Sequence, residues 1–147
     1  MNTNIHELSS FNSACDELVA GKYILIDVKI NSILATIETD EKIKAIVSSC
    51  VNNFNFVELF NSLIASNSLV TPSSNEQIVA VVYNLLYRFK NKEIDFYEFL
   101  TAYFPNEEST DLQFASFASS LISPFKKAVG ELFIQRHVIV ESSDYQN

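Results

Sequence analysis

The residues best placed to do chemistry in this chain lie in one short stretch, positions 92–111. This stretch holds six acidic residues against one lysine, within a chain of 147 residues that carries a net charge of −8. Carboxylates can ligate a hard cation such as calcium, act as acids or bases, or attract a basic partner. Large apolar side chains are interleaved with these acids, so the segment combines charge with apolar area. The residues concerned are Glu93, Ile94, Asp95, Phe96, Tyr97, Glu98, Phe99, Leu100, Tyr103, Phe104, Glu107, Glu108 and Asp111.

Positions 94–100 resemble the end of an EF-hand calcium loop and the start of the helix that follows it. The resemblance implies that Glu98 would be the bidentate calcium ligand. The first and third loop positions would then fall on Tyr87 and Phe89, which carry no carboxylate, and the sixth on Lys92, where the loop needs glycine. The ligand half of the motif is missing, so we expect no calcium binding. The helix–joint–helix geometry could persist without the ion.

Other patterns typical of catalytic or metal sites are missing from the sequence, and we predict no catalytic, cofactor-binding or metal-binding residues. The two histidines, His6 and His137, stand near the two ends of the chain and are interpreted as surface residues. Cys15 is followed by Asp16, whose charge would raise the pKa of the thiol. Both Cys15 and Cys50 stand among apolar neighbours, as buried free thiols do. An enzyme assembled from residues far apart in sequence is left open, and a non-enzymatic protein is favoured.

Charge and hydropathy exclude several classes of partner. A net charge of −8 repels phosphate backbones and anionic lipids, so we expect neither nucleic acid nor membrane binding. Apolar runs such as 78–83 are far shorter than the roughly 20 residues that span a bilayer. Residues 1–10 are polar and lack the pattern of a signal peptide. The sequence therefore predicts a cytoplasmic protein with a protein partner or a second copy of itself.

Apolar residues recur at helical spacing along nearly the whole chain, which predicts an all-α, compact single-domain bundle of about six helices. The length suits one domain, and 48% of the residues are apolar, as a folded core requires. Only two glycines and three prolines interrupt the chain. We expect one helical domain over residues 1–140 and a flexible tail over 141–147.

Two segments leave alternatives open. Positions 24, 26, 28 and 30 are all apolar, as in a strand, whereas a longer helical stripe runs over 26–37. Helix is favoured because a lone strand would lack a partner, and an α+β fold with one short strand near 23–30 is the alternative. Pro124 interrupts the helical spacing of 111–136. That helix is therefore either kinked or divided, with Ser123 capping its second part.

The helix expected at 94–104 is the candidate functional element, because its apolar residues cover more than one face. Such a helix either lies at the centre of the fold or meets a partner. Central burial is the first interpretation, and an exposed aromatic patch rimmed by acids is the second. For the second, the candidate partner surface consists of Phe96, Glu98, Phe99, Tyr103 and Phe104.

The predicted function is a non-enzymatic cytoplasmic interaction or adaptor module that uses this acid-rimmed aromatic helix. It would bind a helix or peptide of neutral to basic character, or associate with itself, more weakly at higher salt. The alternative is a small helical enzyme or ligand-binding domain with a pocket between helices. A deep cavity lined by convergent polar side chains would favour that alternative.

Overall fold

The computed structural model describes residues 2–65 and 68–146, and the side chains of residues 8–64 and 68–137. Eight α-helices lie in this part of the chain, so the all-α prediction is confirmed. Residues 23–30 form a short 3-10 turn and the start of a helix rather than the strand of the α+β alternative. The elements are α1 (Asn2–Ala20), η1 (Tyr23–Leu25), α2 (Ile26–Thr39), α3 (Glu41–Asn52), α4 (Phe56–Ser62), β1 (Ile64–Ala65), β2 (Ser68–Leu69), α5 (Asn75–Lys90), α6 (Phe96–Tyr103), α7 (Thr110–Phe117), η2 (Ala118–Ile122) and α8 (Ser123–Gln146).

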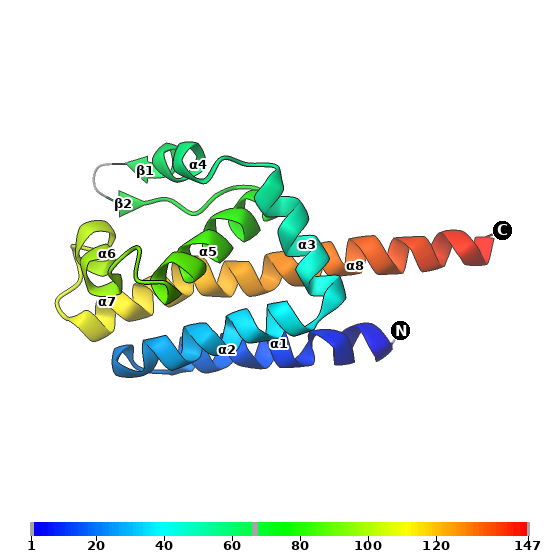
Figure 1. Cartoon of the computed structure of the whole chain (residues 1–147), viewed down its shortest axis with the longest axis horizontal. Coiled ribbons are helices and arrows are strands. Elements are labelled where there is room, and N and C mark those ends of the chain that lie inside the picture. Colours follow the sequence, from blue (N-terminus) through cyan, green and yellow to red (C-terminus); the bar gives the residue numbers. More distant parts are fainter. Residues whose placement is uncertain (1, 66–67, 147) are drawn as a thin grey trace.

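Helix α5 is the central element of the bundle and packs against α2, α3, α4 and α8 (Figure 1). Five consecutive residues, from Ile78 to Val82, are buried, so α5 is covered on all sides at this level. A helix that is apolar all round belongs in the centre of a fold. Helices α1 and α2 form an antiparallel pair along one side, and β1 and β2 pair as a small hairpin beyond α4.

Helix α8 runs beside α1 in the opposite direction, and its C-terminal part projects past the rest of the bundle (Figure 1). Its backbone is helical as far as Gln146. The flexible tail expected at 141–147 lies outside the residues whose side chains are described. The tail, and the single domain over 1–140, stay predictions.

Capping side chains begin α5 and α6. The hydroxyl of Ser74 accepts a hydrogen bond from the backbone N–H of Gln77 at 3.1 Å. The carboxylate of Asp95 accepts one from the backbone N–H of Glu98 at 2.9 Å. Each cap satisfies a free N–H and contributes about 1 kcal/mol. The second cap also fixes an acidic group at the start of α6.

The helix that contains Pro124 is neither divided nor capped at Ser123. Helix α7 passes into α8 through the π-helical turn η2, in which the N–H of Ser123 donates to the carbonyl of Ala118. Proline has no N–H, so the carbonyl of Ser120 cannot receive the usual α-helical hydrogen bond. The hydroxyl of Thr71 donates to that carbonyl at 3.0 Å. A wider turn and a distant hydroxyl together accommodate the proline.

Candidate protein-interaction surface

The structure places two of the three phenylalanines of the expected partner surface, Phe96 and Phe99, inside the protein. The side chains of Phe96 and Phe99 are 8% and 3% exposed. Both rings meet Phe89 of α5 edge-on, with centroids 5.0 and 5.1 Å apart, and both meet Phe117 of α7, at 5.0 and 6.1 Å. These two rings fill the core between α5, α6 and α7. Central burial is the correct interpretation for them, and they are not available for contact with a partner.

The other three residues of that expected surface are more accessible. Tyr103 and Phe104 are half-buried, and their ring centroids lie 4.9 and 6.4 Å from that of Phe99. Glu98 is exposed in the first turn of α6. A partner could reach these side chains, but without Phe96 and Phe99 the surface keeps only the two half-buried rings of Tyr103 and Phe104.

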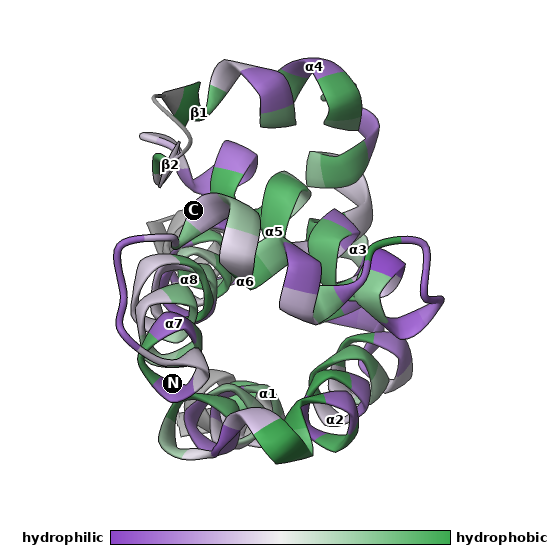
Figure 2. Cartoon of the chain, turned by 90° about the vertical axis from the view of Figure 1, so that its left-hand side faces the viewer, coloured by the Kyte–Doolittle hydropathy of each residue, from purple (hydrophilic) through white to green (hydrophobic). Residues whose placement is uncertain are grey.

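A different set of apolar side chains is exposed at the same end of the bundle, where Figure 2 shows the joint between α1 and α2 below α6. Ile24 of η1 is 84% exposed and Tyr97 of α6 is 50% exposed. The ring of Tyr97 meets that of Tyr23 edge-on, with centroids 6.4 Å apart. A hollow of about 330 Å³ lies here, which we call the η1–α6 hollow. Its lining residues are Tyr23, Ile24, Ile26, Asp27, Phe89, Lys92, Ile94, Asp95, Phe96 and Tyr97.

Two carboxylates against one lysine, Lys92, give the η1–α6 hollow a net negative rim. Asp27 and Asp95 both line it, and Asp27 Oδ2 lies 3.1 Å from Lys92 Nζ. Partial burial raises the pKa of the Tyr23 hydroxyl, and the nearby Asp95, Tyr97 and Asp27 raise that pKa further. The burial that causes most of this shift disfavours any charged group, whereas the effect of the two aspartates disfavours a negative charge in particular.

A second acidic hollow, of about 340 Å³, lies between α4 and α6. Its apolar wall includes Phe60 and Tyr103, whose rings meet edge-on with centroids 5.3 Å apart. Glu93, Asp95 and Glu98 line it as well. Asp95 therefore borders both hollows, and carboxylates stand on both sides of the first turn of α6.

The joint between α5 and α6 turns at Lys92, whose backbone φ is 60°. This is the position at which an EF-hand loop needs glycine, and here the sharp turn is made by a residue with a side chain. A left-handed conformation costs such a residue roughly 1–2 kcal/mol. Within the described residues, no group of three or more His, Cys, Asp or Glu side chains is placed to hold a metal ion.

The backbone at this joint can be tested by comparing Lys92→Gly with Lys92→Val. Both substitutions remove the exposed ion pair with Asp27, so their difference isolates the backbone. We expect the glycine variant to have the higher free energy of unfolding, by about 1–3 kcal/mol, because a β-branched residue is strained at positive φ. Urea denaturation followed by circular dichroism measures this difference. Equal stability of the two variants would contradict the left-handed turn.

Sequence reasoning missed three exposed apolar residues at the α1–α2 joint. Ile24, Leu25 and Val28 are 84%, 48% and 61% exposed. The signal was present in the sequence, because the buried face of α2 is the predicted stripe from Ile26 to Ile37. Apolar residues that fall outside such a stripe belong to the exposed side of the helix or of its joint.

An open groove of about 750 Å³ lies between α1 and α8, and we call it the α1–α8 groove. It is the interhelical pocket that would suit an enzyme, but its charged groups are paired with neighbouring groups. Lys126 Nζ lies 2.7 Å from Asp16 Oδ1, and Glu131 Oε2 accepts a hydrogen bond from the side-chain amide of Asn75 at 3.1 Å. Lys126, Asp16 and Glu131 are therefore not free to act as an acid or a base.

The thiol that lines this groove is not activated as a nucleophile. Cys15 is fully buried, and burial raises the pKa of its thiol to about 12, with a further rise from Asp16 and an opposing effect of Lys126. A thiol with this pKa forms almost no thiolate at neutral pH. The ring of His137 packs against Phe133, with centroids 4.5 Å apart. His6 lies outside the residues whose side chains are described.

Comparison of the chain with protein-family models, characterised proteins and solved structures gave no match. Among the helices that the structure describes, none has both the length and the apolar character needed to cross a bilayer. The surfaces that can support a function are therefore the two acidic hollows around α6 and the α1–α8 groove.

Proposed function

We propose that this protein is a non-enzymatic interaction module of the cytoplasm that binds a basic segment of a partner protein. The observation that carries the proposal is the η1–α6 hollow, in which Ile24 and Tyr97 are 84% and 50% exposed. Asp27 and Asp95 border the same hollow. Exposed apolar area with a charged rim is the usual composition of a protein contact surface.

The sign of the charge supports a basic partner. Glu93 and Glu98 add carboxylates beside α6, and the chain as a whole carries a net charge of −8. Such a surface attracts lysine and arginine side chains and speeds their encounter, and the attraction weakens as salt rises. The exposed ring of Tyr97 also offers a face on which a cation can rest. The partner segment therefore combines a large apolar side chain, which contacts Ile24, with basic residues.

The rest of the predicted aromatic helix supports this surface. Phe96 and Phe99 hold α6 in place from the core side, whereas Glu98 extends the acidic face. The two cysteines, Cys15 and Cys50, are buried free thiols, which supports a reducing compartment such as the cytoplasm.

An enzyme or small-ligand domain built on the α1–α8 groove has less support. Small-molecule sites usually enclose most of the ligand, whereas this groove is open. Its Lys126 and Asp16 are already paired, and the pKa of Cys15 is too high for a nucleophile at neutral pH. The groove is better suited to contact with another protein surface.

Titration calorimetry with two synthetic helical peptides tests the proposed function. The peptides have equal length and identical leucine positions, and they differ only in carrying lysine or glutamate at the polar positions. We expect the lysine peptide to bind, and its affinity to fall by at least about tenfold between about 50 mM and 300 mM salt. The glutamate peptide is expected not to bind. Equal binding of both peptides, or of neither, contradicts the proposal.

Matched variants locate the binding site. Ile24→Ser removes the apolar anchor and is expected to weaken binding of the lysine peptide by about tenfold. Val57→Ser is the control, because Val57 is a 60% exposed apolar residue of α4 that lines neither acidic hollow. Asp27→Asn should weaken binding and reduce its salt dependence. If Ile24→Ser binds as tightly as Val57→Ser, the hollow is not the site.

A further inference from the structure

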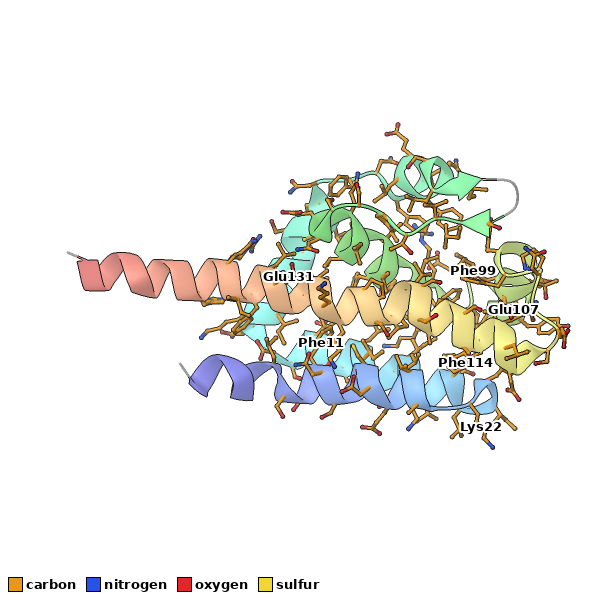
Figure 3. The ribbon with its side chains drawn as sticks, turned by 180° about the vertical axis from the view of Figure 1, so that it is seen from behind. Phe11, Lys22, Phe99, Glu107, Phe114 and Glu131 are labelled. Atoms are coloured by element: carbon orange, nitrogen blue, oxygen red, sulfur yellow. The ribbon has the colours of Figure 1, made fainter. Side chains whose placement is uncertain are left out.

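The α1–α8 groove is an apolar surface that the proposed function does not use. It runs along the two antiparallel helices, and Figure 3 shows Phe11 between them and Glu131 on α8. Val19 and Ile134, which are 39% and 50% exposed, give it apolar area accessible from outside. The groove is lined by Leu8, Asn12, Cys15, Asp16, Val19, Ala20, Ser123, Lys126, Lys127, Gly130, Glu131 and Ile134.

A glycine stands in the wall of the groove, in the interior of α8. A Cβ placed on Gly130 would have no atom within 4 Å, so the packing of this chain does not require glycine there. Glycine in a helix interior is less stable than alanine by roughly 0.5–1 kcal/mol. Because glycine has no side chain, it leaves a shallow depression on the surface of α8 at this point. Another helix can therefore approach closely.

The exposed face of α8 also carries a ridge of side chains. Ser123, Lys127 and Glu131 line the α1–α8 groove on one side and a second hollow, of about 540 Å³, on the other. Helices associate by placing the ridge of one in the groove of the other. The face of α8 supplies both features, so it is shaped to meet a surface like itself.

The charges of the groove select a second copy of this chain as the occupant. Among the described residues that line it, two acids (Asp16 and Glu131) stand with two bases (Lys126 and Lys127). The groove is therefore locally neutral on a chain whose net charge of −8 makes copies repel each other elsewhere. Within one copy Lys126 pairs with Asp16 and Lys127 with Glu131. In a twofold arrangement the same patch meets itself, so these exposed pairs can join across the contact as a set of alternating charges.

We infer that two copies of this protein associate about a twofold axis through the α1–α8 groove, with the α8 helices crossing near Gly130. The exposed apolar groups of Val19 and Ile134 are buried in the contact. The inference goes beyond the proposed function, since it uses different residues. A dimer would present two η1–α6 hollows to the partner.

Sedimentation equilibrium of the full chain tests this inference, over concentrations from about 10 µM to about 500 µM. We expect a monomer–dimer equilibrium for the wild type. Gly130→Leu and Ile134→Asp should each weaken the dimer by at least about tenfold. Val70→Asp is the matched control for the aspartate variant, because Val70 is 51% exposed and lies away from the groove, and it should dimerise like the wild type. Circular dichroism confirms that each variant is folded.

Gly130→Ala distinguishes a role of the glycine in the dimer from a role in the fold of a single copy. We expect its thermal midpoint to rise at low concentration, where the chain is monomeric, because alanine favours the helix and its Cβ meets open space. Its dimer should be weaker than that of the wild type. A wild type that stays monomeric over the whole range, or a dimer that survives Gly130→Leu or Ile134→Asp, overturns the inference. Neither result bears on peptide binding at the η1–α6 hollow.

Discussion

Replacement of Phe99 by alanine is expected to lower the free energy of unfolding by about 3–5 kcal/mol, the usual cost of removing a buried aromatic ring. Phe99 is 3% exposed. Its ring centroid lies 6.3, 5.1 and 6.1 Å from those of Phe60, Phe89 and Phe117, which belong to α4, α5 and α7. Helices that meet around one ring cannot all move inward when it is removed, so a cavity remains. The effect is large because Phe99 joins α6 to the core.

Tyr97→Ala is the matched control for this prediction. Tyr97 lies two positions earlier on the same helix and is 50% exposed. Its loss is expected to lower the free energy of unfolding by less than about 1 kcal/mol, as at most surface positions. Urea denaturation of both variants measures the difference. If Tyr97→Ala proves as destabilising as Phe99→Ala, α6 is oriented differently, and the assignment of Tyr97 to the partner surface fails with it.

The second large effect is expected where α1 meets α8. Phe11 and Phe125 are both fully buried, and their rings meet edge-on with centroids 5.5 Å apart and an angle of 71° between them. Phe11→Ala and Phe125→Ala should each lower the free energy of unfolding by about 3–5 kcal/mol. In the double variant the losses should fail to add by about 0.5–1.5 kcal/mol, because the contact between the rings is lost only once.

A double-mutant cycle by urea denaturation measures that coupling, and Ile134→Ala serves as its control. Ile134 stands on α8 and is 50% exposed, so its truncation should cost less than about 1 kcal/mol and add to that of Phe11→Ala without coupling. Strict additivity of Phe11→Ala and Phe125→Ala would contradict the ring contact. The result also matters for the dimer, since this pair holds together the two helices that form the α1–α8 groove.

The helical fold was predictable because its signals are local. The predicted stripe from Ile26 to Ile37 became the buried face of α2, and Ser74, which stands three residues before Gln77 as in a capping box, caps α5. Each of these two features depends on residues within a few turns of one another. The 3.6-residue period and the types of the capping residues are visible directly in the sequence. The single acidic region at 92–111 was visible for the same reason.

The fate of Pro124 was not predictable, because it depends on a residue far away in the chain. The sequence left a kinked and a divided helix open, and the structure continues the helix through a π-helical turn in which the freed carbonyl, on Ser120, meets the hydroxyl of Thr71. The periodicity of 111–136 contains no information about Thr71. Only the packing of the loop before α5 against η2 brings the two groups together.

In the candidate site too, some features follow from the sequence and others only from the folded structure. Composition and spacing alone established a helical protein with one acidic, aromatic-rich segment around α6, since charge and periodicity are properties of the chain itself. They left undetermined which face of α6 is buried, because apolar residues surround that helix on more than one side. Contacts with Phe89 and Phe117, which come from other helices, place Phe96 and Phe99 in the core and leave Tyr97 outside beside Ile24. Burial is settled by what packs against a side chain, and distant elements meet only in the folded molecule.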